Sequence, residues 1–88
     1  MLEIIREAYG DNGDNVLLTE TPIDDGDTIY SVYLYRHETR HTLQAFYKLA
    51  LHTESKNQIA SIVDDANTVF EEALDFMGLT EAKEDNHD

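Results

Sequence analysis

The sequence predicts an α+β fold in which a three-stranded antiparallel meander precedes a two-helix hairpin that packs on one face of the sheet. The first third of the chain places glycine turn signals between short apolar segments, and the spacing of apolar residues then changes from strand-like to helix-like. The expected strands span about 2–9, 15–22 and 28–36, and the expected helices span about 38–52 and 56–77.

Two dipeptides, Asn12-Gly13 and Asp25-Gly26, separate the three strands, because both tolerate the positive φ angles of hairpin turns. The third segment, TIYSVYLYR, is the clearest strand, since it is rich in β-branched and aromatic residues. The first segment is also compatible with a short helix, and a strand is the favoured interpretation. Pro22 donates no hydrogen bond, which predicts a bulge or an early exit near the end of the second strand.

The two predicted helices follow from apolar spacing and end signals. Ser55 and Gln58 have the spacing of a capping box that begins the second helix, and Gly78 is placed to end it in a left-handed conformation. The first helix is predicted because apolar residues recur at i, i+3, i+4, i+7 and i+8, as on one buried helix face: Leu43, Phe46, Tyr47, Ala50 and Leu51.

The length and composition predict one folded domain. Leu, Ile, Val and Phe supply a quarter of the 88 residues, enough to form a core despite a formal net charge of −13. We expect a single compact domain over 1–79. Residues 80–88 have little to bury and are expected to form a disordered acidic tail.

The chain contains no cysteine, which excludes a disulfide framework and is typical of a reducing cytoplasm. Its first segment, MLEIIREAYG, lacks the basic start and the apolar run of a signal peptide. No stretch approaches the roughly 20 apolar residues of a membrane span. These features predict a soluble cytoplasmic protein.

The charge is unevenly distributed along the chain. Residues 1–27 carry a net charge of −7 and residues 57–88 a net charge of −8, whereas residues 28–56 carry +2. Such a field repels nucleic acid and anionic membranes and attracts basic partners. We therefore expect no direct binding to nucleic acid and none to membranes.

The stretch RHETRH contains His37, Glu38 and His41 in the His-Glu-x-x-His spacing of zinc peptidases. Arg36 and Arg40 flank the pair, which disfavours a dication. On the predicted helix both histidines point away from the apolar stripe, and no third ligand follows at a usual spacing. A polar junction between strand and helix is the favoured interpretation, so we predict no metal, no cofactor and no catalytic residue; a minimal metallopeptidase is the third function considered.

The second predicted helix carries an acidic face. At 100 degrees per residue, five carboxylates fall within one arc opposite the apolar stripe and extend over about 16 Å, without lysines at i+4 to neutralise them. An ordinary solvated helix face is the alternative interpretation. The predicted partner-binding residues are Asp64, Asp65, Glu71, Glu72 and Asp75, with a second patch at Asp24, Asp25 and Asp27.

The third strand carries Tyr30, Tyr33 and Tyr35, which form a candidate surface for self-association. Tyrosine rings anchor protein interfaces well. The β preference of tyrosine alone also explains them. A homodimer is therefore one of the partners considered.

In size, acidity, lack of cysteine and absence of catalytic residues, the chain resembles the small phage-encoded inhibitors that mimic nucleic acid against restriction, CRISPR or DNA-repair proteins. The resemblance implies that carboxylates on a rigid helix stand in for phosphates and occupy the channel of a basic nucleic-acid-binding protein. The alternative is a small self-associating structural or regulatory protein whose charge serves solubility. Neither function is enzymatic.

Overall fold

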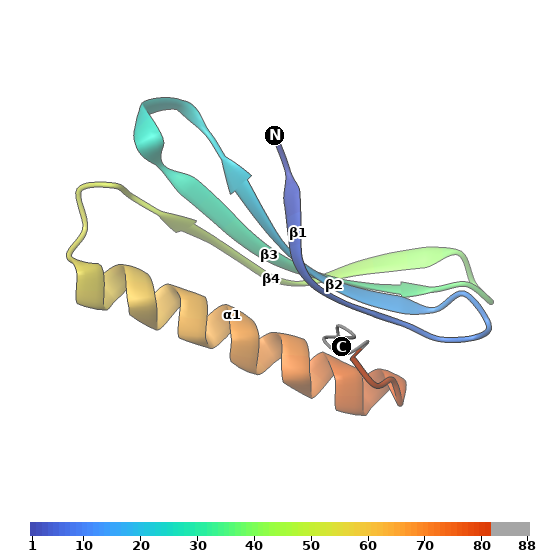
Figure 1. Ribbon diagram of the computed structural model, residues 1–88. Helices are drawn as coiled ribbons and strands as arrows, with labels where there is room; N and C mark the ends of the chain where they lie inside the picture. Colours follow the sequence, from blue (N-terminus) through green and yellow to red (C-terminus); the bar gives the residue numbers. More distant parts are fainter. Residues whose placement is uncertain (82–88) are drawn as a thin grey trace, which may run out of the picture.

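The computed structural model of the protein describes residues 1–81 and contains a four-stranded antiparallel sheet followed by a long helix (Figure 1). The α+β class is confirmed, and the predicted three-stranded meander with a helical hairpin is wrong. The predicted tail over 80–88 lies, from residue 82 onward, outside the described residues. The elements are β1 (Glu3–Tyr9), β2 (Asn15–Pro22), the 3-10 turn η1 (Asp24–Gly26), β3 (Thr28–Arg36), β4 (His41–Ala50) and α1 (Lys56–Met77).

Strands β1, β2 and β3 form the expected meander, and the first segment is a strand. Both glycine dipeptides lie in the hairpin connections, 10–14 and 23–27. Gly13 and Gly26 take positive φ angles of 99° and 84°, which glycine adopts without a steric penalty. Pro22 is the last residue of β2, and no bulge lies beside it.

The first predicted helix, 38–52, is wrong, because most of it is strand β4, paired along β3. A β-bulge leaves Ala45 as an extra residue opposite β3. The bulge separates Leu43 and Phe46 by three positions although both lie on the side of the sheet that faces α1, and Ala50 follows four positions later. The apolar spacing of this bulged strand therefore imitates the spacing of a helix.

The second predicted helix is confirmed with its bounds, Lys56–Met77. The side chain of Ser55 accepts a hydrogen bond from the backbone N–H of Gln58 at 3.1 Å, and the Gln58 side-chain oxygen accepts one from the Ser55 N–H at 3.3 Å. Gly78 ends the helix with φ 69°. None of the helices in residues 1–81 combines the length and the apolar character that a bilayer crossing requires.

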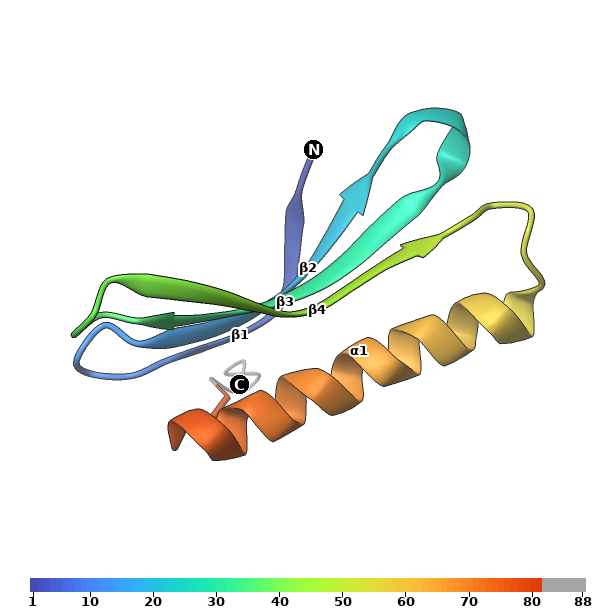
Figure 2. The ribbon, with the colours of Figure 1, turned by 180° about the vertical axis from the view of Figure 1, so that it is seen from behind.

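The core lies between α1 and one face of the sheet (Figure 2). Phe70 is its largest fully buried side chain. Burial of an aromatic side chain of this size contributes about 2–3 kcal/mol to folding. The sheet contributes Ala8, Val16, Leu18, Val32 and Leu34, and the helix contributes Ala66, Phe70 and Ala73.

The strands bend near their middles, and α1 lies on the outer side of the bend (Figure 1). Two bulges, one between Ile4 and Arg6 in β1 and one at Ala45 in β4, provide local kinks that allow this shape. The opposite sheet face lies inside the bend. Within residues 1–81 no further element covers that face.

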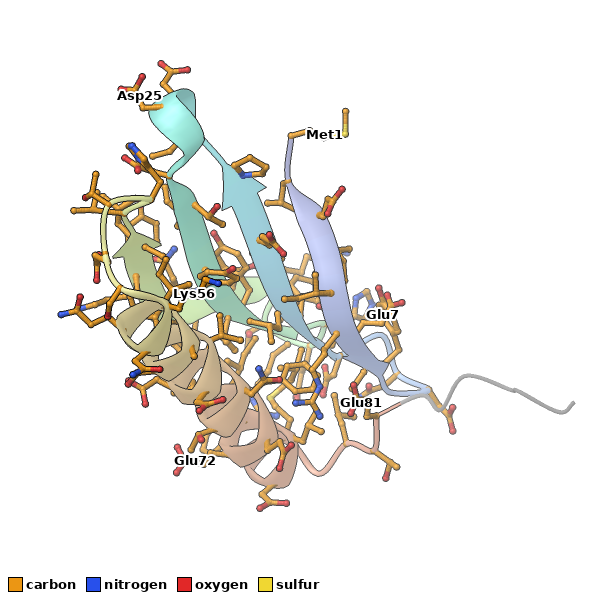
Figure 3. The ribbon with its side chains drawn as sticks, turned by 60° about the vertical axis from the view of Figure 1, so that its left-hand side comes forward. Met1, Glu7, Asp25, Lys56, Glu72 and Glu81 are labelled. Carbon is orange, nitrogen blue, oxygen red and sulfur yellow. The ribbon has the colours of Figure 1, made fainter. Side chains whose placement is uncertain are left out.

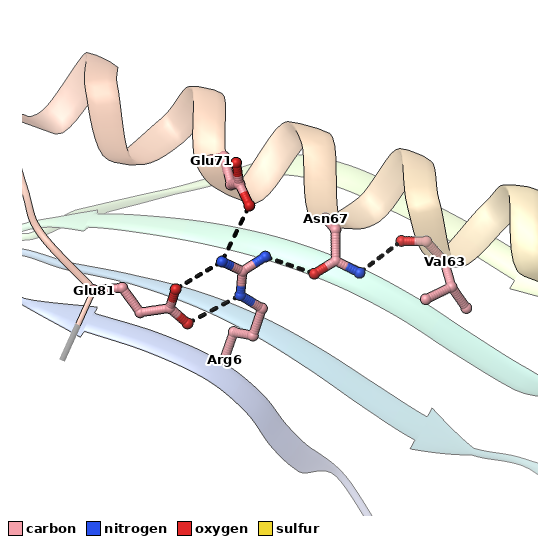
Figure 4. A network of polar contacts seen from close by, with 5 residues as sticks. All are labelled: Arg6, Val63, Asn67, Glu71 and Glu81. Atoms are coloured by element: carbon pink, nitrogen blue, oxygen red, sulfur yellow. Dashed lines mark hydrogen bonds and ion pairs between the residues drawn. The ribbon is translucent and has the colours of Figure 1, made fainter. Parts of the chain in front are cut away.

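Arg6 connects β1 to the second half of α1 and to the segment that follows the helix (Figure 4). Its guanidinium donates hydrogen bonds to both carboxylate oxygens of Glu81, at 2.9 and 2.6 Å, and to the side-chain oxygen of Asn67 at 2.6 Å. The carboxylate of Glu71 lies 3.2 Å from the same guanidinium. One cation thereby holds the first strand, the helix and the C-terminal segment together.

Candidate functional site

The five predicted carboxylates of α1 lie together on its exposed side, and we call them the acidic face: Asp64, Asp65, Glu71, Glu72 and Asp75. Helical geometry places Asp64, Glu71 and Asp75 in one row opposite the sheet. Asp65 and Glu72 form a second row nearer β4, where Glu72 projects from the helix into solvent (Figure 3). The packed core below α1 fixes both rows relative to the sheet.

Most of the acidic face is not neutralised by neighbouring cations. Among residues 1–81, Glu71 is its sole member with an ion-pair partner, Arg6. That pair is weak in water, because the Glu71 side chain is 66% exposed and the hydrogen bonds of the guanidinium go to other residues. The acidic face therefore keeps nearly its full negative charge.

An exposed aromatic ring adjoins the acidic face, and the sequence interpretation missed it. Phe76 is 69% exposed, although it lies on the same helix as the buried Phe70. Its position beside Asp75 and outside the apolar stripe was a readable signal. Phe76 borders a shallow groove between α1 and β4, which has Glu72 at its rim and an apolar lining of Leu34, Leu43, Ala45, Val69 and Ala73.

The three carboxylates of the second predicted patch have different environments. Asp24 and Asp25 are exposed on η1, at the opposite end of the molecule from Glu72 (Figure 3). Asp27 instead accepts a hydrogen bond from the backbone N–H of His52 at 2.9 Å and contacts its ring nitrogen at 2.7 Å. The backbone bond, followed by the ring contact, lowers the pKa of Asp27 below its usual value. Asp27 therefore anchors the segment before α1.

The His-Glu-x-x-His stretch is a turn between two strands. Residues 37–40 connect β3 to β4, the N–H of Arg40 donates to the carbonyl of His37 at 3.2 Å, and Arg40 takes φ 55°. The expected junction between a strand and a helix is wrong, because β4 follows. His37 and His41 therefore do not share a helix face, and no three potential metal-ligating side chains gather in residues 1–81.

Asp14 links the first hairpin to this turn. Its buried carboxylate accepts a hydrogen bond from the backbone N–H of His37 at 2.8 Å. The Asn12 side chain donates to the same carboxylate at 3.2 Å. The bond from His37, followed by that from Asn12, lowers the pKa of Asp14 below its usual value. No local sequence pattern indicates this contact, which spans 23 positions.

The three tyrosines predicted for self-association lie on two faces of the sheet. Tyr33 and Tyr35 lie on the face away from α1, and the Gln44 side chain donates to the Tyr33 hydroxyl at 3.3 Å. Tyr30 lies on the α1 side, packed against the core, and burial raises its pKa. The structure therefore brings together two of the three.

Comparison with protein-family models, with curated proteins and with solved structures found no match to this chain.

Proposed function

We propose that this protein is a small acidic, non-catalytic binding protein that inhibits a basic nucleic-acid-binding protein by mimicking nucleic acid, as phage-type anti-restriction and anti-CRISPR inhibitors do. The acidic face of α1 is the mimic. The observation that carries the proposal is that four of its five carboxylates have no ion-pair partner within residues 1–81. A cytoplasmic location goes with this role, because such targets act on intracellular nucleic acid.

The average charge density along the acidic face supports mimicry. Five carboxylates between Asp64 and Asp75 occupy about 16 Å of helix, or about one charge per 4 Å. One strand of duplex DNA carries about one phosphate per 3.4 Å. A cationic channel that accepts a nucleic-acid strand would thus meet a similar linear charge density on α1.

The rigidity of α1 adds to the effect of the charge on its acidic face. The helix is capped at both ends and packs through Ala66, Phe70 and Ala73 on the sheet. Its carboxylates are therefore held in place before binding, which lowers the entropy that association must overcome. Uncompensated like charges on one face reduce helix stability, and a partner-binding role gives a reason for their retention.

Phe76 gives the proposed surface an apolar contact beside the charges. Charge complementarity mainly accelerates association and selects the partner, whereas buried aromatic side chains supply much of the affinity. Phe76 and the groove next to Glu72 would receive an apolar side chain at the edge of the basic channel. Asp24 and Asp25 form a second, separate contact in this proposal, and Asp27 remains structural.

A competition assay tests the function. Purified restriction, CRISPR and DNA-repair proteins with basic channels are loaded with a fluorescent DNA duplex, and the protein is added. We expect it to release the duplex from at least one target at about 50 mM salt. Its direct binding to that target, measured without DNA, should be much weaker at about 500 mM salt, because screening weakens the attraction between exposed charges. Failure to release DNA from any target at low salt, or direct binding that is independent of salt, would overturn the proposal.

A further inference from the structure

The sheet face turned away from α1, which we call the open face, carries apolar and aromatic side chains among mostly uncharged polar ones. An antiparallel sheet with one face in water usually alternates apolar residues inward with polar residues outward. In this sheet both faces are rich in apolar side chains. By register, the open face contains Ile4, Leu17, Tyr33, Tyr35, Tyr47 and Leu49.

These side chains remain accessible in the single chain. Tyr47 is 59% exposed and Ile4 is 47% exposed, at the two opposite edges of the sheet. The cross-strand row that joins them contains the small, buried Thr19 and Ser31, and the half-buried Tyr33 and Tyr35 lie in the rows beyond it. Large continuous apolar surfaces are uncommon on monomeric soluble proteins and usually mark an interaction site.

The open face also lacks the charge that covers the rest of the molecule. Among the strand residues that alternate onto it, Glu7 is the single ionisable acid, and no Lys or Arg is present. The Tyr9 hydroxyl donates to the Glu7 carboxylate at 2.8 Å. In a chain with a formal net charge of −13, this is the face that a like-charged neighbour can approach with the least repulsion.

We infer that the open face binds the open face of a second copy of this chain, so that two sheets pack face to face with one helix on each outer side. A basic partner would favour the acidic face over this neutral one. Two identical copies instead present the same apolar and nearly uncharged surface to each other, as a twofold symmetric interface requires. Packed antiparallel sheets of this kind form the core of β-sandwiches.

The dimensions fit a weak dimer. The four strands contain seven to ten residues each and lie about 4.8 Å apart, so the open face, taken as flat, covers roughly 500 Å² per copy. Two copies would bury roughly 1,000 Å², which is the lower limit for a biological interface. With about 10 Å for each packed layer, the two helices lie roughly 30 Å apart, well beyond the screening length of about 8 Å. The dimer thus keeps the two acidic faces apart and open to solvent.

Analytical ultracentrifugation of the full chain at about 0.1 mM tests the inference. We expect a species of twice the 10.1 kDa chain mass. Tyr47→Glu and Ile4→Glu should each raise the dissociation constant at least about tenfold, because each places a charge in the apolar interface. Both side chains are exposed in the single chain, so the variants should fold, and circular dichroism checks this.

Phe76→Glu is the matched control, since it introduces the same charge at an exposed apolar residue on the helix side. The dimer should persist in this variant. Pairing along the edge of β4 would respond to Tyr47→Glu and not to Ile4→Glu, because Ile4 lies on β1 at the other edge. A monomer at 0.1 mM, dependence on β4 alone, or loss of the dimer in Phe76→Glu would each overturn the inference, whatever the result of the DNA-release assay.

Discussion

The guanidinium of Arg6, on the first strand, lies 2.6 Å from the carboxylate of Glu81, 75 positions further along the chain. This bidentate pair lowers the pKa of Glu81, mainly through the side-chain hydrogen bond from Arg6. It places the segment after α1 against β1. The acidic helix is thus fixed on the sheet by its apolar stripe and by a polar link beyond its C-terminal end.

Glu81→Gln should lower the free energy of unfolding by about 1 kcal/mol, because one charge-assisted bidentate pair is lost in a partly screened position. Urea denaturation at neutral pH measures the change. Glu71→Gln is the matched control and should cost less than half as much, since the Glu71 side chain is 66% exposed. Equal costs for the two variants would show that Glu81 has no special role.

Thr19→Val should raise the free energy of unfolding by about 1 kcal/mol. The Thr19 hydroxyl is buried and has no hydrogen-bond partner within the described part of the chain, so a methyl group removes a desolvation cost. The half-buried Thr21, on the same strand and face, provides the control, because Thr21→Val should leave the stability nearly unchanged. A destabilised Thr19→Val variant would contradict this reading of the hydroxyl.

Asp27→Asn should destabilise the protein at neutral pH and have no effect in strong acid. The folded-state pKa of Asp27 lies below the ordinary value of 3.8, so the ionised carboxylate stabilises the fold above that pH. The contribution is lost as the pH falls through the lowered folded-state pKa. Urea midpoints of the variant and the parent, measured at neutral pH and at about pH 2, should differ at the first pH and converge at the second.

Asp24→Asn is the control for this pH dependence, because the exposed Asp24 belongs to the same turn and its side chain makes no hydrogen bond within residues 1–81. Its denaturation midpoint should match that of the parent at both pH values. If the difference between Asp27→Asn and the parent persists unchanged in acid, Asp27 stabilises the fold through the shape of its side chain and not through its charge.

Local signals were sufficient for three strands and for α1. Hairpin glycines, a β-rich segment and a capping box are set by residues close in sequence, so their structural consequences can be predicted without the rest of the fold. The five carboxylates of the acidic face were predictable for the same reason. Once the bounds of α1 are known, helical geometry alone determines which residues share a face.

Strand β4 was not predictable because two features removed its alternating pattern. The bulge at Ala45 shifted the apolar positions along the strand. In addition, the uncovered sheet face carries Tyr47 and Leu49, at positions where a solvent-exposed face usually has polar residues. The pairs Arg6–Glu81 and Asp14–His37 join residues far apart in sequence, and only the tertiary structure brings them together.

We expect the acidic face of α1, and not the net charge in general, to bind the partner. The decisive measurement compares two variants in the duplex-release assay, each with four carboxylates neutralised and an identical net charge. The first carries Asp64→Asn, Asp65→Asn, Glu72→Gln and Asp75→Asn, and the second carries Glu3→Gln, Glu7→Gln, Asp11→Asn and Glu38→Gln, all at exposed positions.

We predict that the variant neutralised on α1 loses duplex release by at least about a hundredfold at low salt, whereas the variant neutralised elsewhere stays within about threefold of the parent. Circular dichroism should show both variants folded, since none of the eight side chains is buried. Equal losses in the two variants, or full release by the variant neutralised on α1, would show that the acidic face is not the binding surface.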